Sequence, residues 1–132
     1  MKRLYKLGTL AQDTVVGLKT IFKLGLQDKY NTLEQPQDTD YQVDSEKKFY
    51  ITRVSCTGDA ANTLIQLLYG DDAVSNSDNP PANHKFISPH YKCCTADVCY
   101  CHDIFFEVPA GKYPAIHVTI GNAIVEVQGL EI

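Results

Sequence analysis

The strongest hydrophobic pattern in this chain lies in residues 108–132. Apolar residues alternate with polar ones on both sides of Gly121-Asn122, a dipeptide typical of two-residue hairpin turns. A turn there would pair apolar positions with each other: Ile120 with Ala123, Val118 with Val125, and Ile116 with Val127. The other face of the ribbon would be mostly polar, with His117 opposite Glu126 as a cross-strand ion pair. The turn and the alternation therefore both predict a ribbon that buries one apolar face.

Shorter runs of β-branched and aromatic residues, separated by turn-forming residues, predict further strands along the chain. We expect them within residues 1–9, 14–26, 41–56, 63–69, 85–92 and 104–108. Polar links are expected at residues 27–40, 57–62 and 70–84, of which the last is the longest loop. Residues 14–26 also fit a helical stripe, but their β-branched residues and glycines favour a strand.

The segment 41–56 is predicted to form a strand, a turn and a second strand, with Phe49 and Ile51 on the face opposite Val54. No segment predicts a helix strongly enough to suggest a parallel sheet with crossover helices. Many short strands at a spacing of roughly 8–12 residues instead predict an all-β fold. We expect an antiparallel β-sandwich and, within that class, a jelly roll.

A length of 132 residues suits a single domain, with residues 1–30 as an extended N-terminal arm or strands and 41–132 as the main sandwich. The net charge of −4 does not indicate nucleic-acid binding. Residues 1–30 carry +4 and the remainder −8, so the basic segment either guides self-association, contacts an acidic neighbour, or is a solvated strand face. We expect no membrane span and no signal peptide, and synthesis in a reducing compartment.

Four cysteines lie close together in the sequence: Cys93, Cys94, Cys99 and Cys101. Thiolates and the neighbouring imidazole of His102 are zinc ligands, but the spacing differs from the paired Cys-x-x-Cys of structural zinc sites. The alternatives are buried thiols, or disulfides within the cluster that form after release and close very short rings. Cys56 would then remain as a small buried hydrophobe. No metal or cofactor is predicted.

The sequence contains no strong catalytic motif, so no enzymatic activity is predicted. Cys101 and His102 are adjacent, and neighbours on a strand point to opposite faces, which argues against a shared nucleophilic site. Asp71, Asp72 and Asp78 lack EF-hand spacing and are expected to be solvated loop carboxylates rather than calcium ligands. The eight tyrosines either line a sugar-binding face or pack half-buried on strands or at subunit contacts.

Two stretches, Asp40–Val54 and Phe106–Ile132, resemble small β-sandwich accessory proteins of tailed-phage virions. The resemblance rests on a Phe-Tyr-Ile-Thr strand at residues 49–52, a Val-Pro-x-Gly-Lys turn at 108–112, and a Gly-x-Glu ending at 129–131. It implies a jelly-roll subunit, commonly trimeric and without an enzymatic site, that decorates or cements a capsid or belongs to a head fibre or tail. The chain departs from the pattern at residues 44–47, where Asp-Ser-Glu-Lys replaces Pro-x-Gly, and in its cysteine cluster.

The resemblance implies a non-enzymatic virion protein, assembled in the host cytoplasm, that binds the major capsid protein or other virion proteins. Residues 1–30 are expected to add strands to a partner or to drape over it, and their basic groups suit an acidic shell. The alternative is a carbohydrate- or receptor-binding β-sandwich, which predicts exposed aromatic residues flanking the 70–84 loop. A small metal-dependent domain is a third possibility.

Overall fold

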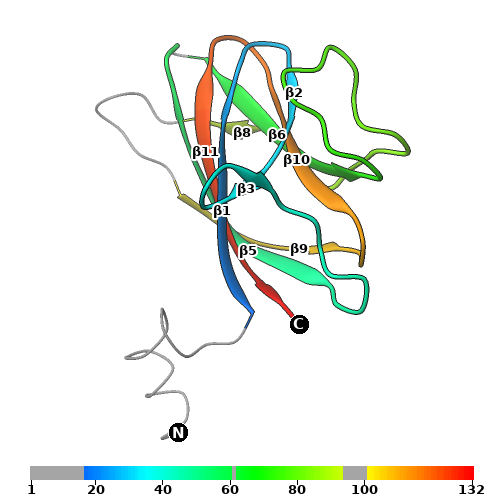
Figure 1. The fold of residues 1–132 in the computed structure, drawn as a ribbon. Helices are drawn as coiled ribbons and strands as arrows, with labels where there is room; N and C mark the ends of the chain where they lie inside the picture. Colours follow the sequence, from blue (N-terminus) through cyan, green and yellow to red (C-terminus); the bar gives the residue numbers. More distant parts are fainter. Residues whose placement is uncertain (1–16, 61, 94–100) are drawn as a thin grey trace, which may run out of the picture.

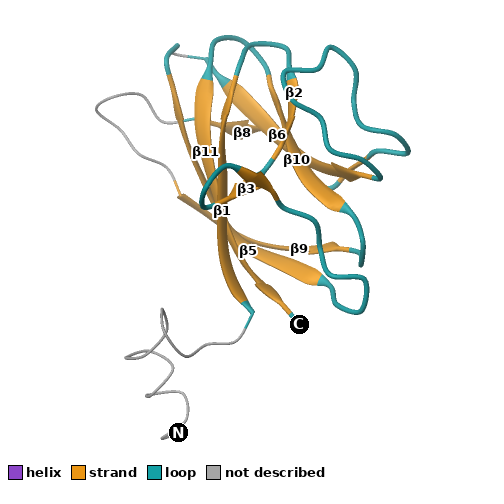
Figure 2. Ribbon diagram, in the orientation of Figure 1, coloured by secondary structure: helices purple, strands orange, loops and turns teal. Residues whose placement is uncertain are grey.

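The computed structural model describes residues 17–60, 62–93 and 101–132, and gives only the backbone for 101–103. This part of the chain forms two antiparallel sheets packed face to face, so the predicted β-sandwich is confirmed (Figures 1 and 2). The strands are β1 (Leu18–Gly25), β2 (Tyr30–Thr32), β3 (Glu34–Gln35), β4 (Thr39–Asp40), β5 (Phe49–Gly58), β6 (Leu64–Gly70), β7 (Lys85–Phe86), β8 (Tyr91–Lys92), β9 (Cys101–Val108), β10 (Tyr113–Val118) and β11 (Ala123–Glu131).

Strands of the two sheets alternate along the sequence. The strand order is β4-β3-β1-β11-β5-β9 in the first sheet and β2-β10-β6-β7 in the second, where β8 also pairs with β6. The chain passes from one sheet to the other between β1 and β2, β2 and β3, β5 and β6, β8 and β9, β9 and β10, and β10 and β11. Inner-face side chains of both sheets form one apolar core, which Leu33, Tyr41 and Val43 enter from the connections between strands.

The predicted C-terminal hairpin is wrong in its pairing, although its apolar face is right. Ile116 and Val118 of β10 are buried, and so are Ala123, Val125 and Val127 of β11. However, β10 pairs with β2 and β6, whereas β11 pairs with β1 and β5.

The physical reason lies in the connection between the two strands. Ile120 and Gly121 both have positive φ, 45° and 74°, and the connection carries the chain across the end of the core to the other sheet. Ile120 is consequently 48% exposed instead of facing Ala123. The two strands bury their apolar faces against each other from opposite layers, an arrangement that alternation alone cannot distinguish from a hairpin.

The predicted alternation in β5 is wrong at Val54, which faces the core together with Phe49 and Ile51. The ladder between β5 and β9 shifts register between Ile51 and Arg53, and the ladder between β5 and β11 shifts at Gly129. Such a bulge inserts one residue and reverses the facing of the side chains that follow. A Cβ on Gly129 would lie 2.4 Å from the backbone oxygen of Tyr50, so the close strand approach there requires glycine.

The strands predicted at 14–26, 63–69 and 104–108 are confirmed by β1, β6 and β9 in the described part of the chain. The link predicted at 27–40 is wrong in part, because β2, β3 and β4 lie within it. Two of its polar residues, Asn31 and Thr32, are buried, and their side-chain oxygens are hydrogen-bonded: Thr32 Oγ1 accepts from the Val74 backbone N (2.9 Å), and Asn31 Oδ1 accepts from the Asn76 N (2.9 Å).

Two further segments differ from the sequence-based expectation. The first strand predicted within 41–56 does not form, although Tyr41 and Val43 are buried. The strand predicted at 85–92 divides into β7 and β8, because Pro89, which lacks a backbone donor, lies between them.

The described part of the predicted N-terminal arm belongs to the sandwich itself. β1 pairs with β11 along its whole length, from Leu18 opposite Leu130 to Gly25 opposite Ala123. Its Ile21 is fully buried in the core. The strand predicted within 1–9, like the rest of residues 1–16, lies outside the described residues.

Candidate binding surface

The 70–84 loop covers part of the outer face of the second sheet. Ala115 and Leu68 point away from the core cluster, yet both are fully buried, as is their neighbour Thr32. The Thr32 backbone N donates to the Val74 oxygen, and the Val74 N donates to Thr32 Oγ1, both at 2.9 Å. Pro81 packs so closely on Gly70 that a Cβ on that glycine would stand 2.5 Å from the proline ring. The loop, green in Figure 1, therefore shields this part of the face from solvent.

The outer face of the first sheet exposes several large apolar side chains on two central strands, among polar ones. We call it the β1–β11 face and define it by Leu18, Phe22, Leu24 and Ile124. Leu24 is 55% exposed and Ile124 58% exposed, and the two residues lie directly opposite each other across the ladder. Apolar groups gathered on one surface of a folded protein are typical of an interaction site.

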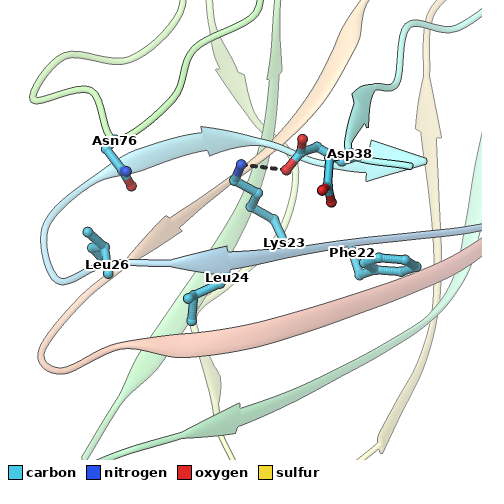
Figure 3. Close-up of a pocket in the computed structure, with 7 residues that line it drawn as sticks. Phe22, Lys23, Leu24, Leu26, Asp38 and Asn76 are labelled. Atoms are coloured by element: carbon cyan, nitrogen blue, oxygen red, sulfur yellow. Dashed lines mark hydrogen bonds and ion pairs between the residues drawn. The ribbon is translucent and has the colours of Figure 1, made fainter. Parts of the chain in front are cut away.

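The ridge formed by Leu24 and Ile124 separates two hollows. The larger, about 490 Å³, is lined by Phe22, Lys23, Leu24, Leu26, Glu34, Asp38 and Asn76 (Figure 3). The smaller, about 280 Å³, is lined by Leu24, Thr57, Gly58, Asp59, Asn122, Ala123 and Ile124. Leu24 borders both hollows, so a partner seated on the ridge has a depression on each side of it.

The larger hollow combines apolar and charged groups. Lys23 points to the Glu34 carboxylate and forms an ion pair with it (Figure 3). The two side chains are only 20% and 12% exposed, so solvent screens this pair less than a pair on the open surface. Asp38 adds a second carboxylate to the same hollow. The site can therefore take an apolar side chain flanked by a basic group.

Side-chain hydrogen bonds hold the turns beside the smaller hollow together. The Asn122 backbone N and Nδ2 donate to the two carboxylate oxygens of Asp59, at 2.7 and 3.0 Å. Gln27 joins them, because its backbone N donates to Asn122 Oδ1 and its Oε1 accepts from the Gly121 N, both at 3.1 Å. Three turns far apart in the sequence thus form one support for the end of the ridge.

The structure brings together two cysteines that the sequence did not associate. Cys56 is buried, as predicted, and its neighbour is Cys93. Cys94 and Cys99 lie outside the described residues, as do the side chains of Cys101 and His102. Among the residues that the structure describes, no group of three His, Cys, Asp or Glu side chains is placed to hold a metal ion.

The predicted ion pair between His117 and Glu126 is wrong, because the two residues lie in different sheets. His117 instead stacks on Tyr30, with ring centroids 4.3 Å apart. Burial lowers the pKa of His117, an effect that Asp28 opposes and His90 reinforces.

The acidic residues of the 70–84 loop are exposed, as predicted, and they also form contacts that anchor the loop. Asp71 pairs with Lys112, and Asn83 Nδ2 also donates to it (2.6 Å). Lys112 and Asn83 together lower the pKa of Asp71. Asp78 pairs with Lys29 beyond the end of β1.

Of the two alternatives for the tyrosines, half-buried packing agrees with the structure: all the tyrosines in the described part of the chain are half-buried except Tyr41, which is fully buried. Its hydroxyl donates to Glu131 Oε2 (2.7 Å), and the Asp44 backbone N donates to the same oxygen (3.1 Å). This contact joins residues 90 positions apart. No local pattern indicates it, because Glu131 looks like an ordinary exposed residue near the end of the chain.

The β1–β11 face was not among the predictions either, although the spacing of apolar residues indicated it. Leu18, Phe22 and Leu24 occur at even spacing, and this set points outward, whereas Ile21 points into the core. Ile124 lies on the ribbon face that the sequence marks as mostly polar. Apolar residues on both faces of one strand are typical of a strand that is covered on both sides, so the spacing in β1 indicated an interaction surface.

Compared with models of known protein families and with curated proteins, the sequence matches none. In the described part of the chain, no helix has the length and apolarity that crossing a membrane requires.

Proposed function

We propose that this protein is a non-enzymatic structural subunit of a virion that binds neighbouring capsid subunits through the β1–β11 face. The observation that carries the proposal is the uncovered apolar ridge of Leu24 and Ile124 with a hollow on each side. The apolar residues Leu68 and Ala115 on the corresponding face of the other sheet are covered by the protein's own loop, and this contrast favours an external partner for the first sheet.

We further propose that the sandwich is a jelly roll. In that fold a long antiparallel chain hairpin is rolled up, so that early strands pair with late strands. Four of the observed pairs follow this rule: β1 with β11, β2 with β10, β5 with β9, and β6 with β7 or β8. The nesting of these pairs supports the resemblance to phage accessory proteins, and the trimer that they commonly form is part of the proposal.

Binding to particles tests the proposed attachment. We expect purified protein to co-sediment with particles of the encoding phage from which the gene has been deleted. The double variant Leu24→Lys and Ile124→Lys is expected to bind at least tenfold more weakly, because it places two charges in the centre of the interface. The measurement is the bound fraction against protein concentration.

The control variant is Phe105→Lys, which alters an even more exposed apolar side chain on the edge strand β9. It should bind like the wild type. Light scattering on all three proteins should give three times the chain mass of 14.7 kDa, which separates self-association from particle binding. Equal binding by the double variant, or no binding by the wild type, contradicts the proposal.

A deletion of the N-terminal residues tests the contribution of the basic segment. Removing residues 1–16 leaves β1 and its buried Ile21 in place, whereas a longer deletion would remove a central strand of the first sheet. In the same assay, unchanged binding by the shortened protein would show that the basic residues 2, 3 and 6 do not contribute to attachment.

A cluster of aromatic rings favours carbohydrate binding as a second candidate function. His84 ends the 70–84 loop and Phe86 lies two residues after it. Their rings contact each other edge to face, with centroids 5.4 Å apart, and the Phe86 ring centroid is also 6.5 Å from that of Tyr30. Exposed rings stack on the apolar faces of sugars, much as they do on other flat ligands. If the protein binds carbohydrate here, we expect binding to glycans on an array that is lost in Phe86→Ala and kept in Phe105→Ala. An array without hits contradicts it.

A further inference from the structure

Cys56 and Cys93 come from different layers of the sandwich. Cys56 lies on β5 in the first sheet, opposite Val125 of β11. Cys93 follows β8 at the edge of the second sheet, where its backbone N donates to the Thr63 oxygen (2.9 Å) and extends the pairing of β8 with β6. A bond between these two residues would therefore join the two sheets.

The backbone brings the two positions together at the end of the core. Gly58, two residues beyond Cys56, lies so close to Thr63 that a Cβ on it would stand 2.7 Å from the Thr63 Cβ. Thr63 in turn holds Cys93. The two cysteine side chains are 2% and 1% exposed and belong to the same core cluster.

The thiol groups themselves are in contact. The Cys56 side chain hydrogen-bonds to that of Cys93, and this bond lowers the pKa of Cys93 against the opposing effect of burial. A lowered pKa increases the fraction of thiolate, which is the nucleophile in thiol–disulfide exchange.

We propose that Cys56 and Cys93 form a disulfide between the two sheets when the protein meets a disulfide oxidant of the glutathione class. The Cys93 thiolate attacks one sulfur of the oxidant and displaces a first thiolate. The Cys56 thiol then loses its proton, attacks the Cys93 sulfur and displaces the second. The oxidant's S–S bond takes up two electrons and becomes two thiols, which also receive the two cysteine protons.

Burial determines when this exchange occurs. An oxidant cannot reach thiols that are almost completely covered, so the reaction takes place before the sheets close or when the β8 edge opens. A chain made in a reducing compartment would then acquire the bond after leaving it. The bond would clamp the layers at the end where β5 passes into β6, whatever partner the β1–β11 face binds.

Refolding in a buffer of reduced and oxidised glutathione tests the proposal. Trypsin cleavage after Arg53, Lys85, Lys92 and Lys112 places Cys56 alone in peptide 54–85 and the other four cysteines in peptide 93–112. We expect mass spectrometry to find these two peptides linked after alkylation of remaining thiols. Electron-transfer fragmentation of the linked pair should place the bond on Cys93. The oxidised protein should melt about 10 °C above the reduced protein.

A triple variant provides the matched control. Cys94→Ser, Cys99→Ser and Cys101→Ser together leave only Cys56 and Cys93, and this protein should keep both the cross-link and the rise in Tm. Cys56→Ala should lose both. The proposal is overturned if peptide 54–85 is recovered fully alkylated, or if the wild-type bond lies on another cysteine.

Discussion

Replacing Phe49 with alanine is expected to lower the free energy of unfolding by about 3–5 kcal/mol. Phe49 is fully buried where β5 begins, and its ring meets that of Tyr41 edge to face, with centroids 5.1 Å apart. Removing the ring deletes apolar contacts and leaves a cavity, because its neighbours on β9 and β11 are held by ladders on both sides. Urea denaturation followed by circular dichroism measures the change.

Phe105→Ala is the matched control for this prediction. Phe105 is 70% exposed and stacks on Tyr50 at 5.5 Å on the outer side of the same sheet. Its replacement should cost about 1 kcal/mol or less. Similar losses for the two variants would mean that Phe49 is not at the centre of the core, and would contradict the packing of the two layers.

Replacing Tyr41 with phenylalanine is expected to cost about 1–3 kcal/mol at pH 7. The substitution keeps the buried ring but removes the hydroxyl that donates to the Glu131 carboxylate, which is itself buried. That carboxylate then retains only the Asp44 backbone N among the described residues as a donor to the same oxygen. Tyr113→Phe is the control, because its hydroxyl has no hydrogen-bond partner in the described part of the chain and should cost little.

The same contact predicts a dependence on pH. Burial, followed by the hydrogen bond to Glu131, raises the pKa of Tyr41 above its ordinary value of 10.0. Above pH 10 the unfolded chain releases this proton while the folded protein keeps it, so unfolding becomes more favourable as the pH rises. The contribution is fully present below pH 10. Since Tyr41→Phe lacks this group, the stability advantage of the wild type should shrink by about 1 kcal/mol between pH 9 and pH 11.

Urea denaturation of both proteins at several pH values provides the measurement. The difference between them removes the titration of other groups, which the two chains share. An advantage that stays constant up to pH 11 would show that Tyr41 is accessible to solvent in the folded protein.

Local sequence patterns predicted the inward-facing residues well wherever the strands were regular. Alternation identified Ile116, Val118, Val125 and Val127 as core residues. Alternation failed at Val54, because a bulge between Ile51 and Arg53 adds one residue to β5 and so reverses the facing of Val54. The bulge depends on the pairing of β5 with β9 and β11, which lie far away in the sequence. The polar stretch at 27–40 hid β2 for a similar reason, since its buried Asn31 and Thr32 side chains accept hydrogen bonds from the distant 70–84 loop.

The candidate sites depended still more on distant contacts. The proximity of Cys56 to Cys93 follows from the meeting of the two sheets, whereas the sequence drew attention to the neighbouring cysteines instead. The exposure of Leu24 and Ile124 follows from where the 70–84 loop lies, because that loop covers the second sheet and leaves the first one bare.

The amino-acid sequence by itself determined that the chain is all β, where most of its strands run, and which side of the C-terminal strands is apolar. These properties follow from backbone preferences and from a side-chain period of two, both of which act over a few residues. Only the tertiary structure decided that β10 and β11 belong to opposite sheets and that one apolar face stays uncovered. Strand partners are selected by which pairing buries the apolar faces of all strands together, so they cannot be inferred from the pattern of any single segment.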